Sequence, residues 1–267
     1  MQLRRAFALV LGLALPAIYI IAQSSGTLSA QLVDVVFMLF TGSCTVLAFI
    51  MILKVGAHGR LGLLHVGMFT CMLLIFLGAV TSSIYTIILG VLAPFPSVAD
   101  ALNFLGYASV AIFGLRFLWY FRSAFSELQF KLTPLLGVLV AGPKLILTHP
   151  SLTTQVTPVA EATWLAYPIL DGLLVVLAVM VLLLFNEGKV SSSWRWLAVG
   201  MALITIADVI IGIGNIQGWS QLVQPFYLFY FWGYICIGLG FSLTPKFERL
   251  QPLEPDYHKT KFMRSLD

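Results

Sequence analysis

Three ionisable residues stand inside long apolar stretches of this 267-residue chain. Lys144 lies in "LLGVLVAGPKLIL", Asp171 in "AYPILDGLLVV" and Asp208 in "LITIADVIIGI". A charged side chain at the centre of a membrane helix costs about 2.5–3.5 kcal/mol on insertion scales, so such residues face protein or water and take partners. Two acids and one base in a low dielectric should form an ion pair, and one acid can then stay protonated.

The two aspartates are expected at the same depth, and the side chain of Lys144 can reach toward them. Helix rise is about 1.5 Å per residue, which places Asp171 and Asp208 about 14 Å below the same face of the membrane and Lys144 about 6 Å below it, with a long side chain. We therefore expect them to converge in one half of the molecule. The cluster can be an ion pair that fixes helix packing, a ligand or ion pocket open to the outside, or a catalytic site. A Schiff base on Lys144 has weaker support.

A further acid, Asp100, stands with Asn103 in the stretch "PFPSVADALNFLGY". Ser97 and Asp100 have the spacing of a capping box, and an acid in the first turn also complements the helix dipole. Asp34, near the start of another apolar run, has the same interpretation. We nevertheless count Asp100, Asn103 and Tyr167 as candidate ligand-binding residues, because they are expected at the mouth of the same half.

The composition indicates that the helices carrying these residues lie in a lipid bilayer. Hydrophobic residues make up 60% of the chain and charged residues 10%, against about 25% charged in a soluble domain. The basic residues never gather on one face, which argues against nucleic-acid binding. The three cysteines lie inside apolar runs without metal spacing, and the histidines offer no matched pair for haem. We expect no cofactor, no metal and three buried free cysteines.

The apolar runs predict an all-α bundle of eight membrane helices in residues 1–243, followed by a short cytoplasmic tail at 244–267. The predicted spans are 6–22, 31–53, 61–92, 98–121, 132–148, 162–185, 194–217 and 221–243. Fourteen of the fifteen basic residues, all but Lys144, fall on one side of these spans. This distribution predicts that both termini are cytoplasmic. The first span also has features of a signal peptide, but its removal would spoil this orientation pattern.

Two spans depart from a regular helix in their sequences. The third is too long for one straight crossing. The fifth is short and contains two prolines and two glycines, so we expect it to be kinked or partly unwound.

The sequence also contains an internal repeat. "FLGYASVAIFGL" (104–115) matches "FWGYICIGLGFS" (231–242), and upstream "HVGMFTCM" (65–72) matches "AVGMALIT" (198–205). These matches pair the third and fourth spans with the seventh and eighth as parallel helical hairpins. The fifth and sixth spans form a weaker third copy. Membrane proteins built from repeats often place their site where the copies meet.

Several of these motifs together resemble the multi-span membrane sensor region that precedes diguanylate cyclase or histidine kinase domains in bacterial and archaeal signalling proteins. The resemblance covers about residues 60–243. Its pattern is P-S-x-A-D with a tyrosine seven residues on, then Y-P-x-x-D, then an aspartate in the next helix. The matching residues here are Pro96, Ser97, Ala99, Asp100, Tyr107, Tyr167, Pro168, Asp171 and Asp208.

The chain departs from that family in two ways. Tyr227 stands where the last helix of the family often begins with an acid, and no output domain follows. The resemblance therefore implies a stand-alone, receptor-like subunit that binds a small or lipid-like ligand in the outer half. Such a subunit would relay to a signalling or complex partner through its cytoplasmic loops and tail.

Two alternatives remain. Eight spans with acids in apolar helices are also similar to the lysoplasmalogenase family of membrane hydrolases, in which Asp171 and Asp208 would activate water. The chain can also be an accessory subunit of a larger membrane complex.

Overall fold

A computed structural model of the chain describes residues 30–91, 94–148, 157–185, 191–219, 222 and 224–244. All regular elements within these residues are helices, and none is a strand. The α-helices are α2 (Ala30–Val55), α3 (Gly59–Ser83), α4 (Val98–Tyr120), α5 (Glu127–Thr148), α6 (Pro158–Leu184), α7 (Ser191–Ile216) and α9 (Tyr227–Leu243). A π-helical turn at Ile84–Ile88 follows α3, and short 3-10 turns precede α5 and α9.

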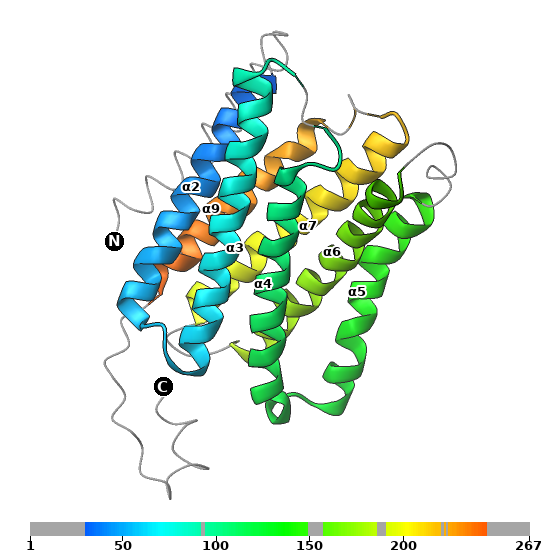
Figure 1. Cartoon of the computed structure of the whole chain (residues 1–267). Helices are drawn as coiled ribbons and strands as arrows, with labels where there is room; N and C mark the ends of the chain where they lie inside the picture. The colour runs from blue at the N-terminus through cyan, green and yellow to red at the C-terminus, as the bar shows by residue number, and fades with distance from the viewer. Residues whose placement is uncertain are drawn as a thin grey trace, which may run out of the picture.

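Six of the helices form a closed ring. In the order α2, α3, α4, α6, α7 and α9, each helix packs against the next, and α9 packs back against α2 (Figure 1). The helix α5 stands outside the ring, against α6 and α7. The most extensive helix pairs are α3 with α4 and α7 with α9, and α5 packs mainly on α6. These three pairs are the hairpins that the sequence repeat predicts, although the repeat itself stays a prediction.

The ring has the properties of a multi-pass membrane bundle. Six helices, α2 to α7, are long and apolar enough to cross a bilayer, and α9 is a shorter apolar helix of 17 residues. Large apolar side chains point outward along these helices, for example Leu53, Ile112 and Val138, where hydrocarbon is their natural solvent. We call the end at which α4 and α6 begin the outer end, after the predicted orientation, and the opposite end the inner end.

The helices lie close to the predicted spans two to eight, with a later start for α9, which begins at Tyr227. The predicted first span at 6–22 and most of the tail lie outside the described residues, so the count of eight spans stays a prediction. The expectations that the fifth span is short and partly unwound are wrong. The helix α5 has 22 residues, and it continues unbroken through Pro134 and Pro143. Its extra length lies at the inner end, where it begins at Glu127 rather than at residue 132.

Glycines set how closely paired helices approach. A Cβ on Gly172 of α6 would lie 2.6 Å from the carbonyl oxygen of Gly137 on α5. A Cβ on Gly200 of α7 would likewise lie 2.6 Å from the carbonyl oxygen of Gly233 on α9. Small residues that let backbones touch are the usual means of helix association in membranes. The first contact fixes α5 against α6 at the level of the candidate site.

Candidate functional site

A buried ion pair joins α5 to α6. The Lys144 Nζ donates to Asp171 Oδ2 at 2.9 Å. Asp171 is 0% exposed and Lys144 7% exposed. The structure thus brings together the base and one of the two acids that the sequence singles out. Lys144 turns toward protein and not toward lipid.

The geometry of α5 explains why Lys144 reaches Asp171. Gly137, Ala141 and Lys144 lie on one face of the helix, because residues four and seven apart share a face. Gly137 touches the backbone of Gly172, the neighbour of Asp171, so the lysine seven residues further along arrives at the seam between α6 and α7. There its side chain lies over Gly212 of α7, where a Cβ would be 2.6 Å from the Lys144 Cε. A larger residue at position 212 would collide with the lysine.

Asp208 on α7 completes the cluster. Its Oδ2 accepts a hydrogen bond from the Tyr107 hydroxyl of α4 at 3.3 Å, and its Oδ1 accepts one from the Tyr230 hydroxyl of α9. The carboxylates of Asp208 and Asp171 and the ammonium of Lys144 lie within electrostatic reach of one another. Unlike Asp171, Asp208 is partly exposed. The cluster therefore draws on five helices, α4, α5, α6, α7 and α9.

One oxygen of this cluster has no partner. Within the described part of the chain, Asp171 Oδ1 is buried and accepts no hydrogen bond. Leaving a buried polar atom unpaired costs about 1–3 kcal/mol, and more when the group is charged. The other three carboxylate oxygens of the two acids each accept a hydrogen bond. The open acceptor of the site is therefore Asp171 Oδ1.

A second polar contact stands one helical turn toward the outer end. The Tyr167 hydroxyl of α6 donates to Asp100 Oδ1 of α4 at 2.9 Å, and both residues are partly exposed. We call this pair the latch. The predicted capping box is confirmed, because Asp100 Oδ2 accepts from the Ser97 backbone N–H at 2.8 Å and from the Ser97 hydroxyl at 2.9 Å. Asp100 thus caps its own helix and holds α6 at the same time.

Two other predicted residues take different places. Asn103 packs against α3, where a Cβ on Gly78 would lie 2.7 Å from its Oδ1, and it also lies beside the Tyr167 hydroxyl. It lies beside the latch and takes no part in the ion pair. Asp34 lies beyond the first turn of α2, and its Oδ2 accepts a hydrogen bond from the Thr86 hydroxyl at 2.6 Å. That bond joins α2 to the π-helical turn after α3, a contact that its position near a span start did not predict.

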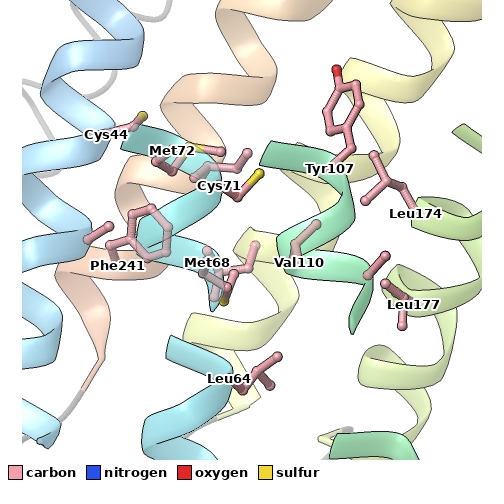
Figure 2. Packing of buried hydrophobic residues seen from close by; sticks show 14 of the residues in the cluster. Cys44, Leu64, Met68, Cys71, Met72, Tyr107, Val110, Leu174, Leu177 and Phe241 are labelled. Carbon is pink, nitrogen blue, oxygen red and sulfur yellow. The ribbon is translucent and has the colours of Figure 1, made fainter. Parts of the chain in front are cut away.

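An apolar cavity of about 40 Å³ lies in the middle of the ring, next to the cluster. Leu174, one turn beyond Asp171, and Tyr107 line it, and Figure 2 shows both among the packed residues. The rest of the lining comes from α3, α4, α7 and α9: Met68, Cys71, Met72, Val110, Met201, Ile204, Ile237 and Phe241. Met68 with Met201 and Val110 with Ile237 are equivalent positions in the predicted repeat, so the cavity sits where the two copies meet. The three cysteines are free and buried, as predicted.

Stacked aromatic rings close the ring of helices toward the inner end. Trp194 of α7 stacks on Phe185, which follows α6, at 4.8 Å between ring centroids, and on His65 of α3 at 5.5 Å. Phe117 of α4 stacks on Phe185 at 5.9 Å. We call these four residues the inner stack. It joins four helices, of which α4, α6 and α7 also carry residues of the cluster.

The chemistry of the site is that of a buried hydrogen-bonded ion cluster. Among the described residues, no three His, Cys, Asp or Glu side chains gather as metal ligands. Sequence reasoning missed Tyr107 and Tyr230 as partners of Asp208, although Tyr107 stands as deep from the start of α4 as Asp208 does from the end of α7. Comparison with known proteins gives no guide to the role of the cluster, because no family model, curated protein or solved structure matches the chain.

Proposed function

We propose that this chain is a membrane-embedded, receptor-like sensor. It binds a small or lipid-like ligand in the outer half of the bundle and relays that binding to a partner protein on the cytoplasmic side. The observation that carries the proposal is the buried Lys144–Asp171 pair beside Asp208, with one carboxylate oxygen left open. Ionisable groups at such depth are rare in membrane proteins and mark ligand, ion or proton sites.

The residues that carry the sensor resemblance support this proposal by bonding to one another. Tyr167 bonds to Asp100, and Tyr107 bonds to Asp208. Asp171, the remaining acid of the motif, pairs with Lys144 between these two bonds. The acids and tyrosines of the motif thus lie in three separate polar contacts between helices and are not scattered over the bundle surface.

The inner stack provides a route from the site to the cytoplasmic side. The helices α4, α6 and α7 run as continuous helices from the cluster to Phe117, Phe185 and Trp194. A ligand that shifts α6 against α7 at Asp171 would therefore change how Phe185 meets Trp194. Packed interfaces of this kind change between discrete arrangements, which converts small shifts at a site into larger ones elsewhere.

We further propose that the chain crosses the cell membrane eight times with both termini in the cytoplasm. In this arrangement the inner end faces the cytoplasm and its Lys and Arg residues follow the positive-inside rule. The loops at that end and the tail at 244–267 would contact the partner.

The hydrolase alternative has less support. Three of the four carboxylate oxygens already accept hydrogen bonds from Lys144, Tyr107 and Tyr230, which leaves a single oxygen to activate water. The neighbouring cavity of about 40 Å³ is apolar and far smaller than a lipid. Turnover of a lysolipid by the purified protein would favour the enzyme instead. A role as an accessory subunit predicts a stable complex whose composition does not depend on the cluster.

Hydrogen exchange on the full-length protein in lipid nanodiscs tests the proposal. The variant Asp171→Asn removes the carboxylate of Asp171, and Glu161→Gln removes an exposed acid near the start of the same helix as a matched control. We expect Asp171→Asn, and not Glu161→Gln, to change exchange in the peptides around Phe117 and Trp194. Unchanged exchange at the inner end in a folded Asp171→Asn protein would contradict the relay.

A further inference from the structure

We infer that the ligand of this cluster is a small cation with N–H donors, a primary ammonium group, which binds beside Asp171. The inference rests on the proposed function only in that a ligand reaches the cluster. Three features together indicate this class of ligand: the charges of the cluster, the unpaired oxygen of Asp171 and the small apolar cavity beside it.

The charge of the outer half favours a cation. Five acids lie in or near the outer halves of the described helices, and Lys144 is the only base among the described residues there. The acids are Asp34, Asp100, Glu161, Asp171 and Asp208. Within the cluster itself two carboxyl groups face one ammonium, so a second cation would supply the counter-charge that allows both acids to be ionised. A pocket lined by one sign of charge raises the local concentration of ions of the opposite sign.

The hydrogen bonds of the cluster call for a donor. Asp171 Oδ1 is buried without a partner in the described chain, and a carboxylate oxygen can only accept. The Tyr107 and Tyr230 hydroxyls already give their protons to Asp208, so their oxygens can only accept from a further group. Apart from the Lys144 Nζ, which donates to Asp171 Oδ2, the groups that face a ligand here are therefore acceptors. An anion or a neutral carbonyl compound would leave them unpaired, whereas an N–H cation matches both their charge and their hydrogen-bonding capacity.

The cavity limits the size of that cation. Tyr107 of the cluster and Leu174, one turn beyond Asp171, line a neighbouring apolar space of about 40 Å³. This space is much smaller than the roughly 150 Å³ cavity that holds benzene. A methyl or similarly short alkyl group fits this space, while a long chain would require its methionines to repack. Methionine side chains repack more easily than other apolar side chains. Because repacking still costs free energy, we expect the preferred ligand to be small.

The latch lies on the outer side of this site. Tyr167 is one turn before Asp171 on α6, and its bond to Asp100 ties α6 to α4 above the buried carboxylate. Asp208 and both latch residues are partly exposed, while Asp171 is not. Entry of a ligand to Asp171 from the outer end therefore passes the latch, and Tyr167→Phe should speed binding and release together.

The test uses the full-length protein in detergent, with thermal unfolding followed by tryptophan fluorescence. Methylammonium is the probe, and sodium chloride keeps the ionic strength constant. Tetramethylammonium supplies the charge without N–H donors, and methanol supplies a donor without the charge. Ligand that binds only the folded state raises Tm in a saturable way. We expect this rise with methylammonium alone, in the wild type and in Glu161→Gln, and its loss in Asp171→Asn.

Three results would overturn the inference: no rise with methylammonium in the wild type, an equal rise with tetramethylammonium, or an unchanged rise in Asp171→Asn. The wild-type comparison decides the matter even if Asp171→Asn fails to fold. The two proposals can also fail separately. If methylammonium has no effect while Asp171→Asn still changes exchange at the inner end, the ligand class is wrong and the sensor proposal stands.

Discussion

Replacing Lys144 by methionine should harm the protein more than replacing its partner Asp171 by asparagine. Lys144→Met leaves Asp171 fully buried without its counter-charge, and it leaves Asp208 within electrostatic reach of the same site. Removing one member of a buried ion pair in this way lowers the free energy of unfolding by about 3–5 kcal/mol. Asp171→Asn instead leaves Lys144 with Asp208 as a second counter-charge. Its cost should be about 1–3 kcal/mol, the range for one impaired buried hydrogen bond.

Reversible unfolding of the purified protein in mixed detergent micelles measures both variants, and the double variant Lys144→Met/Asp171→Asn completes the cycle. The double variant should be more stable than Lys144→Met alone, because the uncompensated carboxylate at position 171 is gone. Equal costs for the two single variants would show that Asp208 does not share Lys144, and the three-residue cluster would then reduce to an isolated pair.

Three further predictions concern the packing of α5 against α6, the hydrogen bond from Tyr107 to Asp208, and the orientation of the chain in the membrane. Gly172→Ala should lower the free energy of unfolding by about 1–3 kcal/mol, because the added Cβ would lie 2.6 Å from the backbone oxygen of Gly137. Gly142→Ala is the control, because a Cβ there would have no neighbour within 4 Å, and it should be neutral or stabilising in the same unfolding assay. Tyr107→Phe removes one donor to Asp208 and should cost about 1.5–3 kcal/mol in that assay, and no measurable loss would mean that the bond is not formed. In intact cells, a membrane-impermeant maleimide should label Gln217→Cys directly and Ser126→Cys only after permeabilisation, and the reverse pattern would invert the proposed orientation.

The sequence predicted much of this bundle because apolar length and charge are local signals. Seven predicted spans have counterparts among the helices, since about 20 apolar residues are needed to cross a bilayer. Depth counted along the helices was enough to expect Asp171 and Asp208 at one level, with the long side chain of Lys144 reaching toward them. The capping box at Ser97 and Asp100 was readable because its two partners stand three residues apart.

What the sequence did not reveal depends on which helices become neighbours. The place of α5 outside the ring follows from backbone contacts such as Gly137 with Gly172, and a single glycine in an apolar run does not name its partner. Tyr230 stands in a stretch dense in aromatic residues. The sequence around it therefore does not distinguish a tyrosine that donates to Asp208 from one that only packs between helices. Thr86 lies beyond the last turn of α3, and its bond to Asp34 spans two helices.

The central claim is that Lys144 lies against Asp171 inside the bundle, and a solid-state NMR distance measures this directly. In protein labelled with ¹⁵N at the lysine Nζ and ¹³C at the aspartate carboxyl carbon, rotational-echo dephasing detects a lysine within contact distance of an aspartate. The 2.9 Å separation of Lys144 Nζ and Asp171 Oδ2 predicts strong dephasing in the wild type and in Asp208→Asn, and its loss in the double variant Asp171→Asn/Asp208→Asn. Dephasing that is absent from the wild type, or that persists in the double variant, would contradict it.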